Sequence, residues 1–344
     1  MTLHSDRPNR AAVLLSPNTI EVQDWDEPTP GPADVVIEVA AVGVCGSDVH
    51  YFKHGRIGDI VIDRPLVLGH EAAGTISAIG KDVKHLQVGD RVTLEPQRPC
   101  GHCEQCWSGA YNMCPDVIFM AAPPYHGAFA RRVVNPADFT FRIPDSMSFE
   151  EAALMEPLAV GFWAAERAQI GAGKKCLVIG AGPIGLLAAQ VLAARGASSI
   201  VISDVNPERI NIVRRFGRFI AHDAGADPSY ASVESVDHII ECSGSPEVLN
   251  RALQRARPRG SVALVGINVN GRANIDVWSI MAKELMMVGV YRYAGIYPRV
   301  IALASSGQID LKSIITHTFD LDHTGDALSQ SSRNMSSIKS IVLP

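Results

Sequence analysis

Apolar residues in the first half of the chain occur in short runs that Gly, Pro and Asp interrupt. The runs at 35–42, 74–79, 90–94 and 128–134 have the length and the β-branched content of strands. Polar or small residues separate them at irregular intervals, and no segment among them has a long helical period. The pattern predicts an irregular, mainly antiparallel β domain.

The pattern changes near residue 150. Ser148 and Glu151 have the spacing of a helix N-cap and its capping-box glutamate, and apolar residues follow at helical spacing to about Ala168. Apolar runs then alternate with helical segments, which predicts βαβ units and a parallel sheet. The last 50 residues return to an irregular mixture, and no internal repeat is visible. The alternating segments are 175–180, 183–195, 200–204, 207–216, 236–242, 246–255 and 262–267.

Composition is that of an ordinary globular protein of two domains: 344 residues, 47% hydrophobic and 19% charged. The net charge of −5 and the mixed charge pattern provide no basic face for nucleic acid, so we expect no nucleic-acid partner. The basic residues between Arg251 and Arg259 are interpreted as the solvated end of a surface helix.

Neither an export signal nor a membrane span is expected. The first residues are polar where a signal peptide needs an apolar core. The uncharged segment 176–194 is interrupted by Gly180, Gly182, Pro183 and Gly185, so it is interpreted as a buried strand, a turn and a buried helix. Seven cysteines without an export signal favour a reducing compartment, and we expect a cytoplasmic protein.

A glycine turn, Gly180-Ala-Gly182-Pro-Ile-Gly185, lies between a predicted strand and a predicted helix. Such a turn lets the backbone approach a pyrophosphate at the helix N-terminus. Asp204 ends the next predicted strand, where an acid accepts hydrogen bonds from the ribose hydroxyls; the alternative is a loop aspartate without a ligand. Val205 follows rather than a cation, which favours NAD over NADP.

Two groups of residues have the composition of metal sites. Four cysteines lie between Pro99 and Pro115, and they suit zinc or an iron–sulfur cluster, with disulfides the weakest alternative in a reducing compartment. Upstream, a second set offers sulfur, nitrogen and oxygen donors, which suit a zinc ion with one open coordination position. The alternative for its cysteine is a small core residue, as a lone cysteine usually is. The two sets are Cys100, Cys103, Cys106 and Cys114, and Cys45, His70, Glu71 and Glu156.

Together these motifs resemble those of the zinc-dependent medium-chain dehydrogenases, and within them the polyol (sorbitol, xylitol and L-arabinitol) dehydrogenases. The similarity covers nearly all of the chain. The resemblance implies an α/β protein in which a GroES-like, mainly β catalytic domain (1–156 and 291–344) is interrupted by a Rossmann, doubly wound NAD-binding domain (157–290). Its motifs are VCGSDVHY at 44–51, GRIG at 55–58, LGHE at 68–71, GDRV at 89–92, EPLAV at 156–160, the glycine turn and Arg292-Tyr293.

The resemblance also implies two zinc ions per chain. C-x2-C-x2-C-x7-C is the spacing of the family's structural zinc lobe, whereas a bacterial ferredoxin has three residues before its last cysteine. The catalytic zinc is placed on Cys45, His70 and Glu71, with water as fourth ligand. Glu156 then stands where alcohol dehydrogenases have a third protein ligand, and it binds the metal directly or holds the zinc-bound water.

The remaining site residues are likewise implied by the resemblance. Ser47 and His50 pass the hydroxyl proton outward, with loop hydrogen bonding as the alternative, and Asp48 orients His70. Arg209 packs near the adenine or is solvated, and Phe119 lines the pocket or belongs to the core. The polyol pocket comprises Tyr51, Phe119, Glu156, Arg292 and Tyr293; the cofactor site comprises Gly180, Gly182, Pro183, Ile184, Gly185, Asp204, Arg209, Val265, Gly266, Ile267, Val290, Tyr291 and Arg292.

The implied function is NAD-dependent oxidation of xylitol or D-sorbitol to the ketose by zinc-assisted hydride transfer, in a homotetramer. Arg292-Tyr293 and Glu156 favour polyols because a polyhydroxy chain needs several polar partners. A secondary-alcohol, butanediol or threonine dehydrogenase of the same fold is the alternative. A non-catalytic zinc- or nucleotide-binding protein is a more distant alternative, because such a protein would be expected to lack Cys45 or His70, and both are present.

Overall fold

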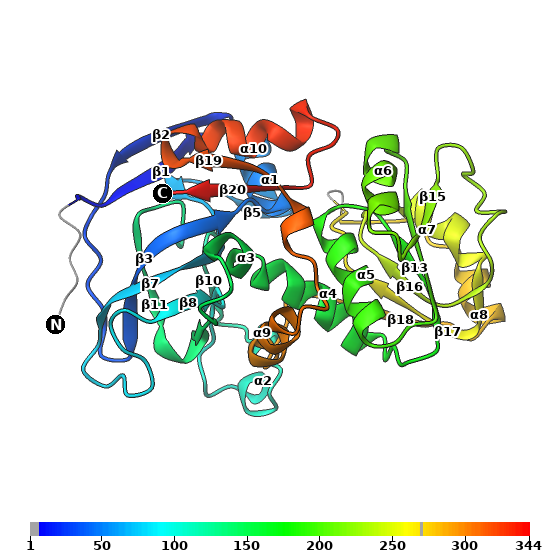
Figure 1. Cartoon of the computed structure of the whole chain (residues 1–344), viewed down its shortest axis with the longest axis horizontal. Helices are drawn as coiled ribbons and strands as arrows, with labels where there is room; N and C mark the ends of the chain where they lie inside the picture. The colour runs from blue at the N-terminus through cyan, green and yellow to red at the C-terminus, as the bar shows by residue number, and fades with distance from the viewer. Residues whose placement is uncertain (1–6, 269–270) are drawn as a thin grey trace. The chain divides into compact units, whose positions relative to one another are not determined.

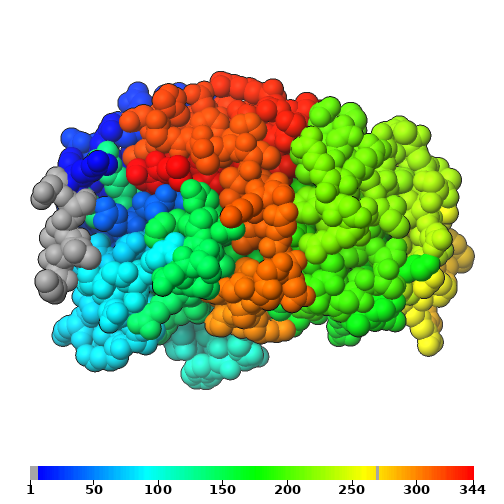
Figure 2. Space-filling model, viewed as in Figure 1, coloured from blue at the N-terminus to red at the C-terminus, as the bar shows by residue number. Residues whose placement is uncertain are grey.

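The computed structural model describes residues 7–268 and 271–344 and divides into two compact units (Figure 1). Unit 1 comprises Met1–Glu156, Tyr297–Ser305 and Leu311–Pro344, and unit 2 comprises Pro157–Ile296 and Ser306–Asp310. Residues 1–6, on which the expectation about export partly rests, lie outside the described residues. Figure 2 shows the red C-terminal residues near the blue N-terminal ones, because unit 1 contains both.

Unit 1 is built on a sheet with the strand order β12-β8-β7-β3-β20-β19, and β11 also pairs with β3. Its neighbours are antiparallel except β19 and β20, which are parallel. The strands are β3 (Asp34–Gly43), β7 (Glu71–Ile79), β8 (Arg91–Leu94), β11 (Arg132–Pro136), β12 (Thr140–Arg142), β19 (Ile315–Asp320) and β20 (Lys339–Leu343).

Smaller elements surround this sheet. The other strands of unit 1 are β1 (Arg10–Ser16), β2 (Thr19–Asp24), β4 (Arg56–Ile57), β5 (Ile60–Val61), β6 (Leu66–Val67), β9 (Gln97–Arg98) and β10 (Ile118–Phe119). The helices are α1 (Gly46–His54), α2 (Glu104–Trp107), α3 (Phe149–Ala153), α9 (Tyr297–Ser305) and α10 (Thr324–Arg333), with 3-10 turns η1 (Tyr111–Met113), η2 (Ala137–Phe139), η3 (Lys312–Ile314) and η4 (Leu321–His323).

The predicted antiparallel strands are confirmed, with one difference. The run at 128–134 joins the sheet only from Arg132 onward. Ala128 and Phe129 instead donate backbone hydrogen bonds to the carbonyls of Gly69 (2.7 Å) and Leu68 (2.9 Å). The first part of the run therefore braces the segment just before His70.

Unit 2 is a six-stranded parallel sheet with the order β15-β14-β13-β16-β17-β18. In chain order this is 3-2-1-4-5-6, the Rossmann topology, in which the strand order reverses between β13 and β16. The strands are β13 (Lys175–Ile179), β14 (Ser199–Asp204), β15 (Ile220–Asp223), β16 (Val236–Glu241), β17 (Ala256–Leu264) and β18 (Met286–Gly289). The helices are α4 (Met155–Arg167, which begins in unit 1), α5 (Pro183–Ala194), α6 (Pro207–Arg215), α7 (Pro246–Leu253) and α8 (Val277–Ala282).

The alternating pattern predicted β13, α5, β14, α6, β16, α7 and β17 of unit 2 but missed β15, α8 and β18, and three further details are corrected. The helix expected from 148 to 168 is interrupted at Leu154, between α3 and α4. Arg257 and Arg259 belong to β17, not to a helix end, and pair with carboxylates at 3.0 Å and 2.9 Å. The last 50 residues form α9, α10, β19 and β20, and the buried residues of α9 recur at helical spacing (Tyr297, Val300, Ile301 and Ala304). No helix within the described residues has both the length and the apolar character of a membrane span.

Candidate active site and metal centres

Helix α1 begins at the residue that carries the first candidate ligand. Cys45 is the N-cap, and its N–H donates to the Asp48 carboxylate at 3.0 Å. The other Asp48 oxygen accepts from the Gly69 N–H at 3.0 Å and lies 3.6 Å from His70 Nδ1. One buried carboxylate therefore joins the segment of Cys45 to the segment of His70.

The charges in this cluster favour a cation. Burial alone would raise the pKa of Asp48, but the adjacent His70 and the N–H donors of Cys45 and Gly69 hold it below its usual value. Burial alone would lower the pKa of His70, but Asp48 and Cys45 raise it well above the usual value. Negative groups therefore dominate the potential at the His70 ring.

The structure brings Cys45, His70 and Glu71 together: one donor atom of each lies within 4.8 Å of the others. His70 and Glu71 are buried and Cys45 is half-buried. One sulfur, one nitrogen and one oxygen donor make up the three-ligand set of an open zinc site, so the residues fit that metal. Among the described residues, Glu156 is not part of this group, although it is also buried.

A residue that the sequence analysis missed lies against this group. Lys339, at the start of β20, is 2% exposed and forms an ion pair with the Glu71 carboxylate. Its ammonium also donates to the Val44 carbonyl at 2.8 Å. The only sequence signal was a lysine inside the apolar run 338–343.

Glu95 is a second buried carboxyl group that the sequence analysis missed. It accepts hydrogen bonds from Tyr111 Oη at 2.8 Å and from Gln97 Nε2 at 2.9 Å. Burial raises the pKa of Glu95 to about 7, and the nearby Glu156 charge adds to the effect. The Glu156 carboxyl group therefore lies close enough to influence the ionisation of Glu95.

Four of the other predicted residues lie on α1 or near His70. Ser47 and His50 are one helical turn apart and partly exposed, and the pKa of His50 is lowered by partial burial and by His54 and Lys53. Tyr51, in contrast, is buried in the apolar core of unit 1. Phe119 packs against the His70 ring with centroids 5.4 Å apart.

The four clustered cysteines form a second group whose sulfur atoms lie within 4.8 Å of one another. Cys103 precedes α2, and Cys114 follows η1 and accepts from the Cys100 N–H at 3.4 Å. The Cys103–Cys106 and Cys100–Cys106 sulfur separations are 3.4 Å and 3.9 Å, much longer than the about 2.05 Å of a disulfide. Tetrahedral zinc with bonds of about 2.3 Å separates its sulfurs by about 3.8 Å, so the set fits zinc.

In unit 2 the glycine turn follows β13 and leads into α5. Gly180 has φ +97°, and its N–H donates to the Ser203 carbonyl at 2.7 Å. Gly182 is the N-cap and Pro183 the first helical residue, so the free N–H groups of α5 begin there. A Cβ on Gly185 would lie 1.8 Å from the Gly180 carbonyl oxygen, so only glycine permits this close packing.

Asp204 ends β14 beside this turn. Its carboxylate accepts from the Ala181 N–H at 2.7 Å and the Asn206 N–H at 2.8 Å, and Arg209 Nη1 lies 3.7 Å away. Arg209 is therefore oriented toward the aspartate rather than free in solvent. The turn, the acid and the cation therefore lie close together in unit 2.

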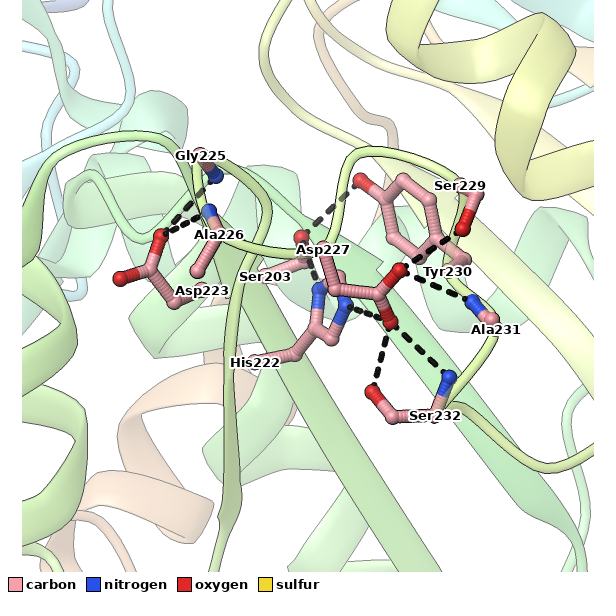
Figure 3. Close-up of polar contacts among 10 residues, drawn as sticks. All are labelled: Ser203, His222, Asp223, Gly225, Ala226, Asp227, Ser229, Tyr230, Ala231 and Ser232. Carbon is pink, nitrogen blue, oxygen red and sulfur yellow. Dashed lines mark hydrogen bonds and ion pairs between the residues drawn. The ribbon is translucent and has the colours of Figure 1, made fainter.

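A buried polar network supports the strand that carries Asp204 (Figure 3). Ser203 Oγ lies 3.0 Å from His222 Nδ1 and donates to Tyr230 Oη at 2.9 Å. His222 Nε2 is 3.3 Å from Asp227, whose carboxylate accepts from Ser232 N–H at 2.9 Å. Ser203 and Tyr230 are fully buried, so this serine–histidine–aspartate arrangement has no access to a substrate and holds the end of β14 in place.

The other predicted cofactor residues follow β17 and β18. Val265 and Gly266 donate to the Glu241 carbonyl at 2.9 Å, and the Val290 N–H donates to the Leu264 carbonyl at 3.0 Å. With Ile267 and Tyr291 they lie at the carboxyl end of the parallel sheet, where open α/β sheets bind ligands.

Arg292 and Tyr293 come next in the chain. Arg292 has a left-handed backbone (φ 52°), and its guanidinium lies 4.8 Å from the Tyr291 ring centre. Tyr293 is fully buried. A non-glycine residue with positive φ costs of order 1–3 kcal/mol and is concentrated at functional sites.

Models of two known domain families match segments of the chain. The family description "Alcohol dehydrogenase GroES-like domain" matches residues 31–145, and "Zinc-binding dehydrogenase" matches residues 183–306.

Individual relatives are similar over almost their whole length. The chain is 41% identical to a sorbitol dehydrogenase of Arabidopsis thaliana (96% of this chain, 94% of the relative). It is 40% identical to a D-xylulose reductase of Morganella morganii (92% and 96%). The solved structure of a 2R,3R-butanediol dehydrogenase of Bacillus subtilis has a TM-score of 0.87 at 31% identity (98% and 99%).

Proposed function

Because the chain belongs to the zinc-dependent medium-chain dehydrogenases, and within them to the polyol dehydrogenases, we propose that it oxidises xylitol or D-sorbitol to the ketose. The net reaction converts a secondary alcohol and NAD to a ketone, NADH and a proton. The convergence of Cys45, His70 and Glu71 is the observation that carries this proposal, since a dehydrogenase of this kind needs an open metal position.

Two zinc ions per chain are part of the proposal. Four cysteine ligands close a tetrahedral site, so Cys100, Cys103, Cys106 and Cys114 would hold a structural ion. Cys45, His70 and Glu71 would hold the catalytic ion and leave one position open, with Glu156 acting directly or through water. Bound zinc is a Lewis acid that lowers the pKa of a hydroxyl group and stabilises negative charge on its oxygen.

The residues around the metal position orient ligands and move the proton. Asp48 fixes the His70 ring, and its hydrogen bond to Cys45 fixes the other ligand segment. Ser47 would accept the hydroxyl proton and His50 would pass it to solvent, because both lie on the same face of α1. The lowered pKa of His50 keeps its imidazole neutral and able to accept that proton at neutral pH.

We assign catalysis to unit 1 and nucleotide binding to unit 2, with NAD preferred over NADP. Gly180, Gly182, Pro183, Ile184 and Gly185 would hold the pyrophosphate. The Asp204 carboxylate would accept the ribose hydroxyls and repel a 2′-phosphate. Arg209 Nη1 lies 3.7 Å from the Asp204 carboxylate, so the guanidinium would offset part of the Asp204 charge and would lie beside the bound adenosine.

The polyol pocket is proposed to involve Tyr51, Phe119, Glu156, Arg292 and Tyr293. Phe119 has the most direct support, since it packs against the candidate ligand His70. Arg292 offers five donors and no acceptor, which suits vicinal hydroxyls. Tyr51 and Tyr293 are buried, so they would shape the pocket wall rather than reach far into solvent.

We further propose a cytoplasmic homotetramer. The proposed use of five of the seven cysteines as zinc ligands rather than in disulfides supports a reducing compartment. Val277, Trp278 and Met281 on α8 are 59%, 74% and 66% exposed. Apolar side chains gathered on one short helix are typical of a surface that another subunit covers.

Butanediol oxidation is the second candidate, because a butanediol dehydrogenase has the same fold at 31% identity. Initial rates with xylitol, D-sorbitol, 2,3-butanediol and L-threonine, each with NAD and with NADP, distinguish the two. We expect the highest kcat/KM with NAD and a polyol, and two zinc ions per chain by metal analysis. A higher kcat/KM for butanediol would replace the polyol assignment, and an enzyme without zinc would refute the mechanism.

A further inference from the structure

Lys339 is among the largest fully buried side chains of unit 1, although it carries a charge. A buried ammonium group is unfavourable unless it is paired and hydrogen-bonded. Here it has the Glu71 carboxylate as ion-pair partner and the Val44 carbonyl as hydrogen-bond acceptor. Both partners belong to segments that carry candidate metal ligands, since Val44 directly precedes Cys45.

The strand order explains how one side chain reaches both segments. β3 lies between β20 and β7, so Lys339 and Glu71 are two strands apart, about 9–10 Å in the hydrogen-bonding direction. Gly43, at the end of β3, pairs with Glu71 on one side and Ile341 on the other. A Cβ on Gly43 would lie 2.0 Å from Glu71 Oε2 and 3.0 Å from Lys339 Cε. Because Gly43 has no side chain, the ion pair between Lys339 and Glu71 forms in the space that a Cβ on Gly43 would fill.

The pair also has an electrostatic role. A zinc ion, the Cys45 thiolate, the Glu71 carboxylate and a neutral His70 sum to zero charge. Glu156 adds one negative charge, and its field, with those of Glu71 and Cys45, acts on the Lys339 ammonium. The buried Asp48 carboxylate adds a further negative charge, so the Lys339 ammonium offsets part of the negative charge around the metal position.

We propose that Lys339 is a positioning residue of the catalytic metal site: through the gap at Gly43 it holds the Glu71 carboxylate and the Val44 carbonyl so that the three ligands stay assembled. A carboxylate has two oxygens, so one can face the ammonium while the other remains for the metal. The inference rests on the proposed function, because it assigns to Lys339 a role at the metal that function requires.

The test uses the full-length, zinc-loaded protein and measures metal retention as well as turnover. Lys339→Met keeps the length of the side chain and removes its charge. Gly43→Ala keeps both charges and fills the gap between them, and its backbone is compatible with alanine because Gly43 has no positive φ. Lys175→Met is the matched control, since Lys175 also pairs with a glutamate, Glu234, but in unit 2.

We expect both unit 1 variants to lose zinc from the catalytic site to a chelator on the order of 10-fold faster than wild type, while the cysteine site keeps its zinc. Cobalt substituted at the catalytic site should show an altered visible spectrum in both. Lys175→Met should match wild type in metal retention and spectrum. If Lys339→Met does not fold, Lys339→Gln, which keeps a donor for the Val44 carbonyl but no charge, decides, because a Cβ on Gly43 also displaces the Glu71 carboxylate directly.

The inference would be overturned if the variant that folds retained catalytic-site zinc like the wild type and its cobalt-substituted form had an unchanged visible spectrum. Failure of the proposed function would be visible separately, in the wild type: it would hold no catalytic zinc or show no polyol turnover. A variant that loses stability but keeps the wild-type rate of metal release would show that the pair is only structural, which also overturns the inference.

Discussion

The buried carboxyl group of Glu95 makes the stability of unit 1 depend on pH. Glu95 is 1% exposed and accepts hydrogen bonds from Tyr111 and Gln97. Glu95→Gln keeps the volume and an oxygen that can accept both bonds, so it removes mainly the charge. The difference in unfolding free energy between wild type and variant therefore isolates the ionisation of one side chain.

The magnitude follows from the two pKa values. The pKa of Glu95 rises from 4.5 to about 7 in the folded protein because of burial. At about 1.4 kcal/mol per tenfold change in an equilibrium constant, this corresponds to about 3 kcal/mol. The folded state keeps its proton to higher pH than the unfolded chain, so this contribution is complete below 4.5 and is lost as the pH rises through about 7. About 2 kcal/mol of it disappears between about pH 5.5 and pH 8.

Urea unfolding, followed by tryptophan fluorescence with zinc present, measures the difference at each pH. We expect Glu95→Gln to gain about 2 kcal/mol relative to wild type over that interval. Infrared spectra should show a protonated carboxyl band at low pH that the variant lacks. Glu21→Gln, at an exposed position, is the control and should show no such trend. The reasoning would be refuted if the difference in unfolding free energy between wild type and variant did not change with pH and the variant kept the protonated carboxyl band.

Three other substitutions test separate sites. Cys103→Ser should release one zinc ion per chain and lower the unfolding temperature, since a structural zinc contributes folding free energy; retention of both ions would contradict the assignment. Asp204→Ala should raise the KM for NAD and narrow the preference over NADP, and a wild type that used both cofactors equally would rule out the proposed role. Arg292→Ala should lower kcat/KM for xylitol or D-sorbitol by on the order of 10²-fold and affect 2,3-butanediol much less, whereas equal losses would make Arg292 a structural or cofactor residue.

Features that depend on neighbours in sequence were predictable. The glycine turn and Asp204 follow consecutive strands of one βαβ unit, so their proximity at the carboxyl end of the sheet follows from the topology. The four cysteines lie within one short segment, and their spacing alone brings their sulfurs together. In both cases the local chain geometry already determines the site.

Features that depend on distant strands were not predictable. Lys339 meets Glu71 only because β20 pairs with β3 and β3 pairs with β7, an order that no local pattern encodes. Glu95 accepts a hydrogen bond from Tyr111, a residue of the segment that contains the four cysteines, and no local pattern predicts that contact. The interruption of the helix at Leu154 was missed as well, because apolar residues continue at helical spacing across it.

The division of the chain has a consequence for the order of folding during synthesis. Unit 2 consists almost entirely of one continuous stretch, Pro157–Ile296, whereas unit 1 needs β19 and β20, which the ribosome makes afterwards. Domains usually fold as units and the N-terminal one first, but here the N-terminal unit cannot complete its sheet until unit 2 has been synthesised. Until β20 joins β3, the nascent chain has Glu71 without the Lys339 ammonium. We therefore expect the parallel sheet to form first and the proposed catalytic metal site to be completed last.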